Sequence, residues 1–308
     1  MNEKVSVTLN SLIKVGQNAK GFSYLPRGGV RSILSGKHAS KLRGRGMDFL
    51  ELKSYVKGDD VKAIDWRATR RTSKTQVRVY NQERDRAVYI LLSQQSNMHF
   101  ASRGYFKSVQ AALLLSLSAH KILKSGDRIG GVIFNDEELV SFKPSKSKKN
   151  LMQMLQETVK YNHKLLEKKT APNPEMLNKA LDFVLVNAKH DDLIILIGDG
   201  SGVNESSTKK ITRLTQHNDL IAAFIYDPLE VSLPKVGKLE FKNSQESLEI
   251  NSSDEELNAN YTKAHQKKMD DLAHLSLMHE IPLLKIRTDK EVLLQLQVQL
   301  GDIARRRR

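Results

Sequence analysis

The chain has 308 residues, 39% of them apolar and none of them cysteine, and it carries a formal net charge of +15. This length suffices for one large domain or two modest ones. The absence of cysteine excludes disulfides, thiolate metal sites and cysteine nucleophiles, and it is consistent with a reduced compartment. Neither a signal peptide nor an apolar run of about 18 residues is present, so we expect a cytoplasmic protein without a membrane span.

The positive charge lies in the N-terminal part and the C-terminal tail. Residues 1–86 hold 19 Lys and Arg against 8 Asp and Glu, residues 305–308 are all Arg, and residues 87–304 carry no net charge. A basic surface that is simply exposed to solvent would explain this distribution of charge without any functional role. The functional alternatives are an acidic protein partner, nucleic acid and anionic lipid head groups. Nucleic acid is not the expected partner, because the segment has few aromatic residues and no recognised binding motif.

Residues 1–85 are predicted to form a basic, β-rich N-terminal accessory region. A helix is predicted at residues 5–19, followed by the stretch LPRGGVRSILSGKHASKLRGRGMDF, which is rich in glycine and basic residues. A turn at residues 57–60 and a strand at residues 75–83, TQVRVYNQE, come next. We expect these strands to lie beside or on the main domain.

Residues 86–308 alternate between strands and helices. Strands are predicted at residues 87–93, 127–136, 137–144, 191–200, 219–228 and 281–288, a surface hairpin at 238–252, and helices at 105–126, 148–165, 174–188, 206–217, 255–279 and 289–306. The runs at 87–93, 191–200 and 219–228 are continuously apolar, as in strands buried on both faces. The alternation predicts an α/β fold, a doubly wound and mainly parallel sheet with helices on both faces. Ligands of such sheets bind at the carboxyl ends of the strands, where Ser93–Asn97 and Asp199 are expected.

An ordered set of motifs occupies residues 44–72, GRGMDFLELKSYVKGDDVKAIDWRATRRT. Its members are a Gly-x-Gly-x-x-Phe opening, a Tyr-x-x-Gly-Asp-Asp stretch, an Ile-Asp-Trp tripeptide and a following arginine: Gly44, Gly46, Phe49, Tyr55, Gly58, Asp59, Asp60, Ile64, Asp65, Trp66, and Arg70 or Arg71. Glu83-Arg84-Asp85 then closes a strand. The set resembles the signature of the von Willebrand factor A-like proteins known as domain of unknown function 58, and the resemblance covers roughly residues 20–230.

The residues of this segment can also be interpreted structurally, independently of the resemblance. Trp66, the only tryptophan, is predicted to be a packing anchor. The neighbouring Asp and Arg side chains are predicted to form hydrogen-bonded pairs that hold an irregular segment together. The alternatives are a surface for a partner and a catalytic acid cluster, although no nucleophile or base accompanies the acids.

The resemblance also implies a metal site at the end of the first sheet strand. In similar proteins that strand ends in Asp-x-Ser-x-Ser, usually followed by Met, and these residues hold Mg²⁺ together with a Thr and a second Asp. Aligned on Met98, the three positions are Ser93, Gln95 and Asn97, while Asp199 matches the second Asp and Thr170 the loop Thr. Only one carboxylate remains, and Mg²⁺ normally needs one or two. We expect a degenerate, metal-free site and no cofactor, with Mg²⁺ binding and an altered small-ligand site as alternatives.

The resemblance implies a von Willebrand factor A-like domain at residues 86–308. It also implies partnership with a MoxR-type AAA+ ATPase, and with other von Willebrand factor A-domain proteins, in a chaperone-like or assembly role. We therefore predict a non-enzymatic adaptor whose basic N-terminal surface meets an acidic face of its partner. The alternatives are a binder of nucleic acid or anionic surfaces, and a metal-dependent binding module or hydrolase.

Overall fold

A computed structural model describes residues 3–24, 47–56, 59–82, 85–167, 170–234, 237–242 and 247–306. The chain divides into two compact units, of which the larger comprises Met1–Pro26 and Arg86–Arg308 and the smaller Arg27–Asp85. The predicted boundary after residue 85 recurs in this division. Residues 1–26 differ from the prediction, because they belong to the larger unit and not to the accessory region.

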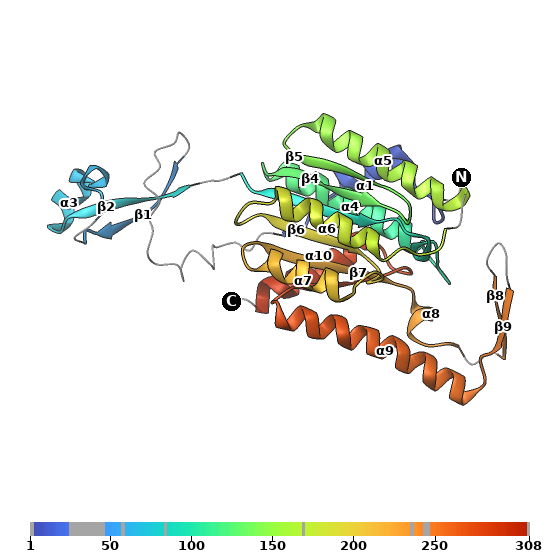
Figure 1. The fold of residues 1–308 in the computed structure, drawn as a ribbon. Helices are drawn as coiled ribbons and strands as arrows, with labels where there is room; N and C mark the ends of the chain where they lie inside the picture. The colour runs from blue at the N-terminus through green and yellow to red at the C-terminus, as the bar shows by residue number, and fades with distance from the viewer. Residues whose placement is uncertain are drawn as a thin grey trace. The chain divides into compact units, whose positions relative to one another are not determined.

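The larger unit is built on a six-stranded sheet (Figure 1). Its strands are β3 (Ala87–Ser93), β4 (Arg128–Phe134), β5 (Leu139–Ser145), β6 (Leu193–Gly198), β7 (Asp219–Tyr226) and β10 (Leu283–Arg287). Their order is β10-β7-β6-β3-β4-β5, and all neighbours are parallel except β5, which runs antiparallel to β4. The strand order switches direction between β3 and β6, so the predicted doubly wound α/β fold is confirmed.

Helices cover both faces of this sheet. One face is covered by α1 (Leu9–Gln17), α4 (Lys107–Lys124), α5 (Lys148–Glu167) and α10 (Val292–Arg306). The other is covered by α6 (Glu175–Asn187), α7 (Glu205–Thr215) and α9 (Glu255–Met278). All seven residues of β3 are buried, and successive side chains enter opposite cores, Ile90 the first and Leu91 the second. A strand that is covered on both faces needs apolar residues throughout, which explains the continuous run AVYILL.

The N-terminal helix α1 belongs to the larger core. Leu12 is fully buried, and its backbone oxygen accepts a hydrogen bond from Ser116 Oγ on α4 at 2.6 Å. Further along, the Tyr24 hydroxyl lies 2.7 Å from Ser118 Oγ, also on α4. The amphipathic pattern of residues 5–19 predicted the helix, but a pattern of this kind does not say which surface its apolar face covers.

The smaller unit combines an antiparallel strand pair with a short helix. β1 (Met47–Ser54) pairs with β2 (Gln76–Gln82), and between them lie the 3₁₀ helix η1 (Val61–Ala63) and α3 (Trp66–Thr72). The predicted β-rich region therefore also contains a helix. Asp65 starts it, because its Oδ1 accepts hydrogen bonds from the Arg67 and Ala68 backbone N–H groups at 2.9 and 3.0 Å.

The remaining described elements are short. The predicted hairpin is formed by β8 (Lys238–Lys242) and β9 (Ser247–Asn251), and η2 (Ser96–Met98) and α8 (Pro228–Val231) follow β3 and β7.

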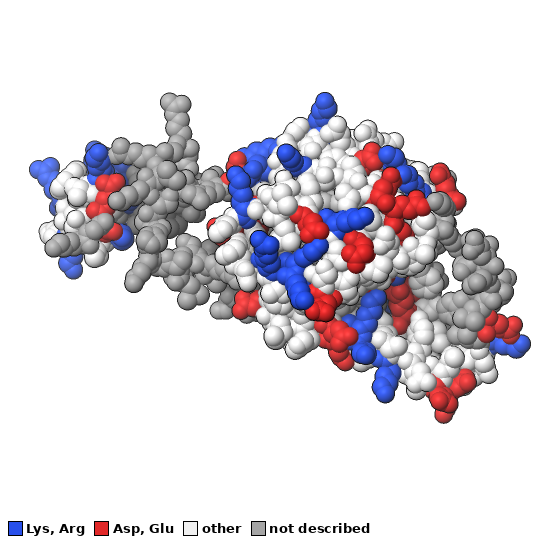
Figure 2. All heavy atoms as spheres, in the orientation of Figure 1, with Lys and Arg blue, Asp and Glu red and all other residues white. Residues whose placement is uncertain are grey.

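On the face of the larger unit seen in Figure 2, Lys and Arg side chains are interspersed with Asp and Glu, as expected for a segment without net charge. None of the described helices combines the length and apolar character that crossing a bilayer requires.

Candidate functional site

The carboxyl ends of β3 and β6 form the edge of the sheet at which the strand order switches. β3 ends at Ser93 and leads into η2, and Asp199 directly follows β6. Because the two strands are parallel neighbours, these loops meet although about a hundred residues separate them in the chain. Asn97 Nδ2 donates hydrogen bonds to Oδ1 and Oδ2 of Asp199 at 3.2 and 3.1 Å. The structure thus brings together two of the residues predicted for the site.

A buried lysine is the third member of this cluster. Lys107, the first residue of α4, is 2% exposed, and its Nζ lies 3.0 Å from Asp199 Oδ2 and 2.7 Å from Glu230 Oε1. Glu230 lies on α8, and its other oxygen accepts a hydrogen bond from the Asp227 backbone N–H at 2.8 Å. The ammonium group is therefore held between two carboxylates that follow two different strands.

Burial and charge act in opposite directions on this lysine. Burial disfavours the charged form of Lys107, but the carboxylates of Asp199 and Glu230 outweigh it and hold the pKa of the ammonium above its usual value. Burial also disfavours the charge of Asp199. The ammonium groups of Lys107 and Lys268 and the Ser201 N–H outweigh that effect and hold the pKa of the carboxyl below its usual value. Both shifts favour an ionised pair at neutral pH.

Gln95 takes part in a second polar cluster. Its Nε2 donates to Asp136 Oδ1 at 2.9 Å and to the Asn173 backbone oxygen at 2.8 Å. Asp136 also accepts hydrogen bonds from the backbone N–H groups of Ser96 and Asn173, at 2.7 and 3.0 Å. Gln95 therefore fastens the β3 loop to the loops after β4 and before α6, and its side-chain NH₂ does not contact Asp199.

The other predicted positions contribute less to the cluster. Ser93 is buried, and its Oγ lies 3.4 Å from Gln95 Oε1. Thr170 forms no hydrogen bond with any other described residue. Ser96 Oγ and Asn97 Oδ1 are buried without a hydrogen-bond partner among the described residues. Ordered water commonly satisfies such atoms.

The contacts of Asp199 do not fit a Mg²⁺ ion. Mg²⁺ requires oxygen ligands at about 2.0–2.1 Å in nearly octahedral geometry. The oxygens of Asp199 already accept hydrogen bonds from Asn97, Lys107 and the Ser201 N–H, and an ammonium 3.0 Å away repels a second cation. Asn97 turns its NH₂ group, which has no lone pair for a metal, toward the carboxylate. Nor do three or more His, Cys, Asp or Glu gather into a metal-binding group within the described part of the chain.

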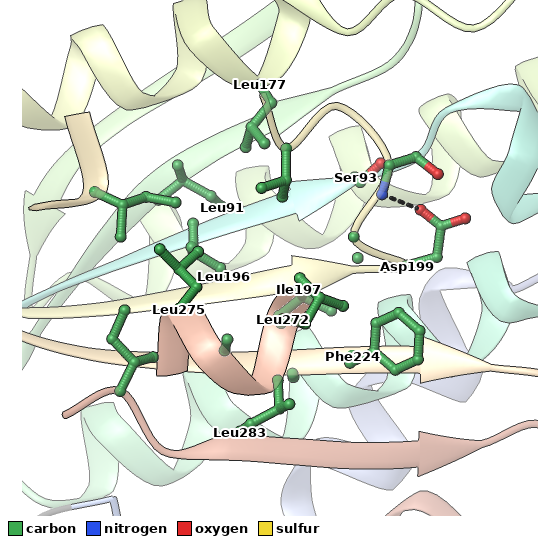
Figure 3. A pocket seen from close by; sticks show the side chains of 18 of the residues that line it. Leu91, Ser93, Leu177, Leu196, Ile197, Asp199, Phe224, Leu272, Leu275 and Leu283 are labelled. Atoms are coloured by element: carbon green, nitrogen blue, oxygen red, sulfur yellow. Dashed lines mark hydrogen bonds between the residues drawn. The ribbon is translucent and has the colours of Figure 1, made fainter. Parts of the chain in front are cut away.

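A small apolar cavity lies beside this cluster, between the sheet and α9 (Figure 3). It has a volume of about 90 Å³, and its wall includes Leu196, Ala222, Phe224, Leu272 and Leu275, with Ser93 and Asp199 at one end. Ligand pockets usually span about 300–1,000 Å³. The cavity is therefore a packing gap under α9, and the charged cluster is the candidate site.

The signature residues of the smaller unit have structural roles where the structure describes them. Asp59 pairs with Lys53 at 2.8 Å, and Asp60 Oδ1 accepts from the Lys62 N–H at the start of η1. Asp65 caps α3 and pairs with Arg78 at 2.8 Å, and this hydrogen bond lowers the pKa of the Asp65 carboxyl. These contacts agree with the predicted hydrogen-bonded pairs.

The other signature residues differ in their exposure and in whether the structure describes them. The side chain of Trp66 is 68% exposed, so the prediction that it is a packing anchor is wrong. Arg70 is exposed as well, and the Tyr55 N–H donates to the Thr75 backbone oxygen at 2.8 Å. Phe49 lies in β1, whereas Gly44, Gly46 and Gly58 lie outside the described residues.

Sequence reasoning missed Lys107, Glu230 and Asp136. Lys107 precedes the apolar helix pattern of α4, where a lysine is expected to face solvent. Glu230 lies on the short helix α8 and Asp136 in the loop after β4, and acidic residues at such positions resemble ordinary surface residues. One signal was available: all three follow or face strand ends of a doubly wound sheet, the edge at which polar side chains converge.

Comparison with known proteins places the chain among uncharacterised relatives. The family model "Protein of unknown function DUF58" matches residues 51–271. Proteins described as "Uncharacterized protein Mb1516" of Mycobacterium bovis and "Uncharacterized protein Rv1480" of Mycobacterium tuberculosis are each 22% identical over 261 residues, which is 84% of this chain and 80% of theirs.

Solved structures resemble the chain more distantly. A conserved hypothetical protein BatB from Bacteroides thetaiotaomicron is 12% identical with a TM-score of 0.42, over 71% of this chain and 99% of that one. An aerotolerance-related membrane protein from Bacteroides fragilis is 14% identical with a TM-score of 0.41, over 70% and 99%.

Proposed function

The chain belongs to the DUF58 family of von Willebrand factor A-like α/β proteins, and on this premise we propose that it is a non-enzymatic adaptor for other proteins. Its partner is a MoxR-type AAA+ ATPase, alone or with other von Willebrand factor A-domain proteins, in a chaperone-like or assembly role. The loops that follow β3 and β6 form part of the contact.

The ion pair of Lys107 is the observation that best supports this proposal. It occupies the edge of the sheet at which an enzyme of this fold keeps its reacting groups. Lys107 is buried and its ammonium is held by Asp199 and Glu230 at 3.0 and 2.7 Å, and its raised pKa keeps it protonated, so at neutral pH it serves neither as a proton acceptor nor as a nucleophile. A fixed internal cation makes the site rigid, and rigid loops are suited to recognition of another protein surface.

The loops around the pair offer accessible groups for such a contact. Val203 is 37% exposed in the loop after β6, and Arg103 is exposed in the loop before α4. This mixture of apolar and basic groups has the polar and apolar composition of a non-obligate protein interface.

The proposal is tested with the purified chain and the purified MoxR-type ATPase from the same cell. Binding is measured by biolayer interferometry with and without ATP. We expect saturable binding that Val203→Glu and Arg103→Glu weaken, because both place a carboxylate in the loops after the strands. The control is Lys124→Glu. Lys124 is an exposed lysine at the end of α4, close to the amino end of β4 and therefore at the edge of the sheet opposite to the site. This variant should bind as the wild type does. If the wild-type chain does not bind the ATPase with or without ATP, the proposed partnership is wrong.

A further inference from the structure

The outward face of α3 consists of one tryptophan and three arginines. Trp66, Arg67, Arg70 and Arg71 are exposed, whereas Ala68 and Thr69 are partly buried against the rest of the smaller unit. Residues four apart on a helix are neighbours, so Trp66 lies next to Arg70, and Arg67 next to Arg71. Figure 2 shows basic side chains projecting from the part of the smaller unit that contains α3. We call these four residues the arginine–tryptophan face.

The nearby carboxylates are engaged elsewhere. Asp65 caps α3 and pairs with Arg78, and Asp59 pairs with Lys53. Arg67, Arg70 and Arg71 accordingly form no ion pair with any described residue. Like charges four residues apart destabilise a helix, and an exposed indole forgoes the stabilisation of burial. The face therefore lowers the stability of the unit that carries it, which is expected of a surface that another molecule covers.

The composition of the unit favours a protein as that molecule. Three aliphatic side chains of the same unit are also exposed, Leu52 by 41%, Val56 by 64% and Val61 by 60%. Tryptophan and arginine are enriched at the energetic centres of protein interfaces, and aliphatic groups extend such a centre. Proteins that bind single-stranded nucleic acid instead use several stacked aromatics. In this unit Trp66 is the only large aromatic that is exposed among the side chains the structure describes.

We propose that the arginine–tryptophan face of α3 docks on an acidic protein surface in which carboxylates surround an apolar pocket. The indole of Trp66 enters the pocket, and the guanidinium groups of Arg67, Arg70 and Arg71 pair with the carboxylates around it. Guanidinium groups suit this role because they bind carboxylates in a bidentate manner. The identity of the partner as the MoxR-type ATPase rests on the proposed function, whereas the acidic and apolar character of its surface rests on α3 alone.

The chain provides its own probe, because Trp66 is its only tryptophan. The emission of the free chain should be that of an indole in water. A titration with a tryptophan-free synthetic peptide that alternates Glu and Leu should shift the emission to shorter wavelength in a saturable manner. The same peptide with every Glu replaced by Lys is the control and should produce no shift. Emission of a buried indole in the free chain would overturn the proposal, since another part of the chain would then already cover Trp66.

Affinity for the ATPase is measured in parallel for variants that keep the fold. Trp66→Ala should weaken binding about 30-fold, the loss typical of an interface hot spot. Arg70→Glu should weaken it about tenfold or more, and Trp66→Phe should retain part of the affinity. Lys74→Glu changes an exposed lysine of the same unit outside α3, and it should stay within about threefold of the wild type.

The outcomes separate this proposal from the proposed function. If the ATPase binds all variants equally, the docking face is wrong and the adaptor function stands. If the ATPase does not bind the wild type, the adaptor function fails and the acidic peptide decides about the face: a saturable shift supports it, and no shift overturns it. A single-stranded oligonucleotide that shifts or quenches Trp66 more strongly than the acidic peptide also overturns the proposal, because the face would then be a nucleic-acid surface.

Discussion

Replacing Lys107 by Met should destabilise the larger unit by about 3–5 kcal/mol at neutral pH. Methionine keeps most of the aliphatic length of the side chain but removes the ammonium group. In the wild type that group lies 3.0 Å from Asp199 and 2.7 Å from Glu230. Asp199 is only 4% exposed, so the variant leaves a buried carboxylate with Asn97 and the Ser201 N–H as its remaining partners. Leaving one member of a buried ion pair behind is the costly case.

The pH dependence tests the electrostatic cause. In the wild type the pKa of Asp199 is lowered, so its contribution to stability is present above the unfolded-state pKa and is lost as the pH falls through the folded-state pKa. The pKa of Lys107 is raised, so its contribution is present below the unfolded-state pKa and is lost as the pH rises through the folded-state pKa. In Lys107→Met, burial should raise the pKa of Asp199. The difference in stability between variant and wild type should therefore shrink as the pH falls from about 7 to about 4.

The free energy of unfolding is measured by urea denaturation followed by far-UV circular dichroism, because Trp66 lies in the smaller unit and does not report on this site. The double variant Lys107→Met/Asp199→Asn removes the stranded charge and should recover part of the loss. Lys209→Met breaks the exposed pair with Glu205 and should cost no more than about 0.5 kcal/mol. A loss below about 1 kcal/mol for Lys107→Met, or a loss that does not change with pH, would show that the buried pair is not what holds the site.

Three further perturbations test the packing and the chemistry of the larger unit. Leu12→Ala should lower the free energy of unfolding by about 2–5 kcal/mol, because Leu12 is fully buried; a loss below about 1 kcal/mol in urea denaturation would mean that α1 is not part of the core. Ala222→Val should raise the midpoint of thermal unfolding by filling part of the cavity of about 90 Å³ under α9, with a gain of about 1 kcal/mol; destabilisation would show that the cavity cannot accept a larger side chain. Titration of the wild type with Mg²⁺ or Mn²⁺ should give no saturable heat in calorimetry, since the Asp199 carboxylate already accepts hydrogen bonds from Lys107 and Asn97; saturable binding at this site would refute the metal-free assignment.

The fold could be predicted well because its strongest signals are local. The continuous apolar run of β3 and the strands and helices that alternate after it specify a sheet buried on both faces. The position of Asp199 after β6 then places it at the edge where such a sheet binds its ligands. Residues 1–26 were predicted to belong to the accessory region and not to the larger unit, because the apolar face of α1 could be recognised without knowing that α4 covers it.

The environments of individual side chains, by contrast, were not evident from the sequence. Trp66 was expected to be a packing anchor, but helix α3 starts at this residue and turns it outward. The partners of the polar side chains at the site lie far away in the chain. Asn97 and Gln95 occupy equivalent positions in the motif, yet the first contacts Asp199 and the second Asp136.

What the sequence determined by itself is the α/β architecture, the order of its strands and helices along the chain, and the presence of only one carboxylate among the residues of the predicted metal site. Only the tertiary structure showed that the charge of this carboxylate is balanced by Lys107, 92 residues earlier in the chain. Apolar periodicity follows from the regular geometry of helices and strands, so it can be read along the chain. A buried ion pair has no period, and it exists only because the folded sheet brings two charged groups to the same edge and excludes water from them.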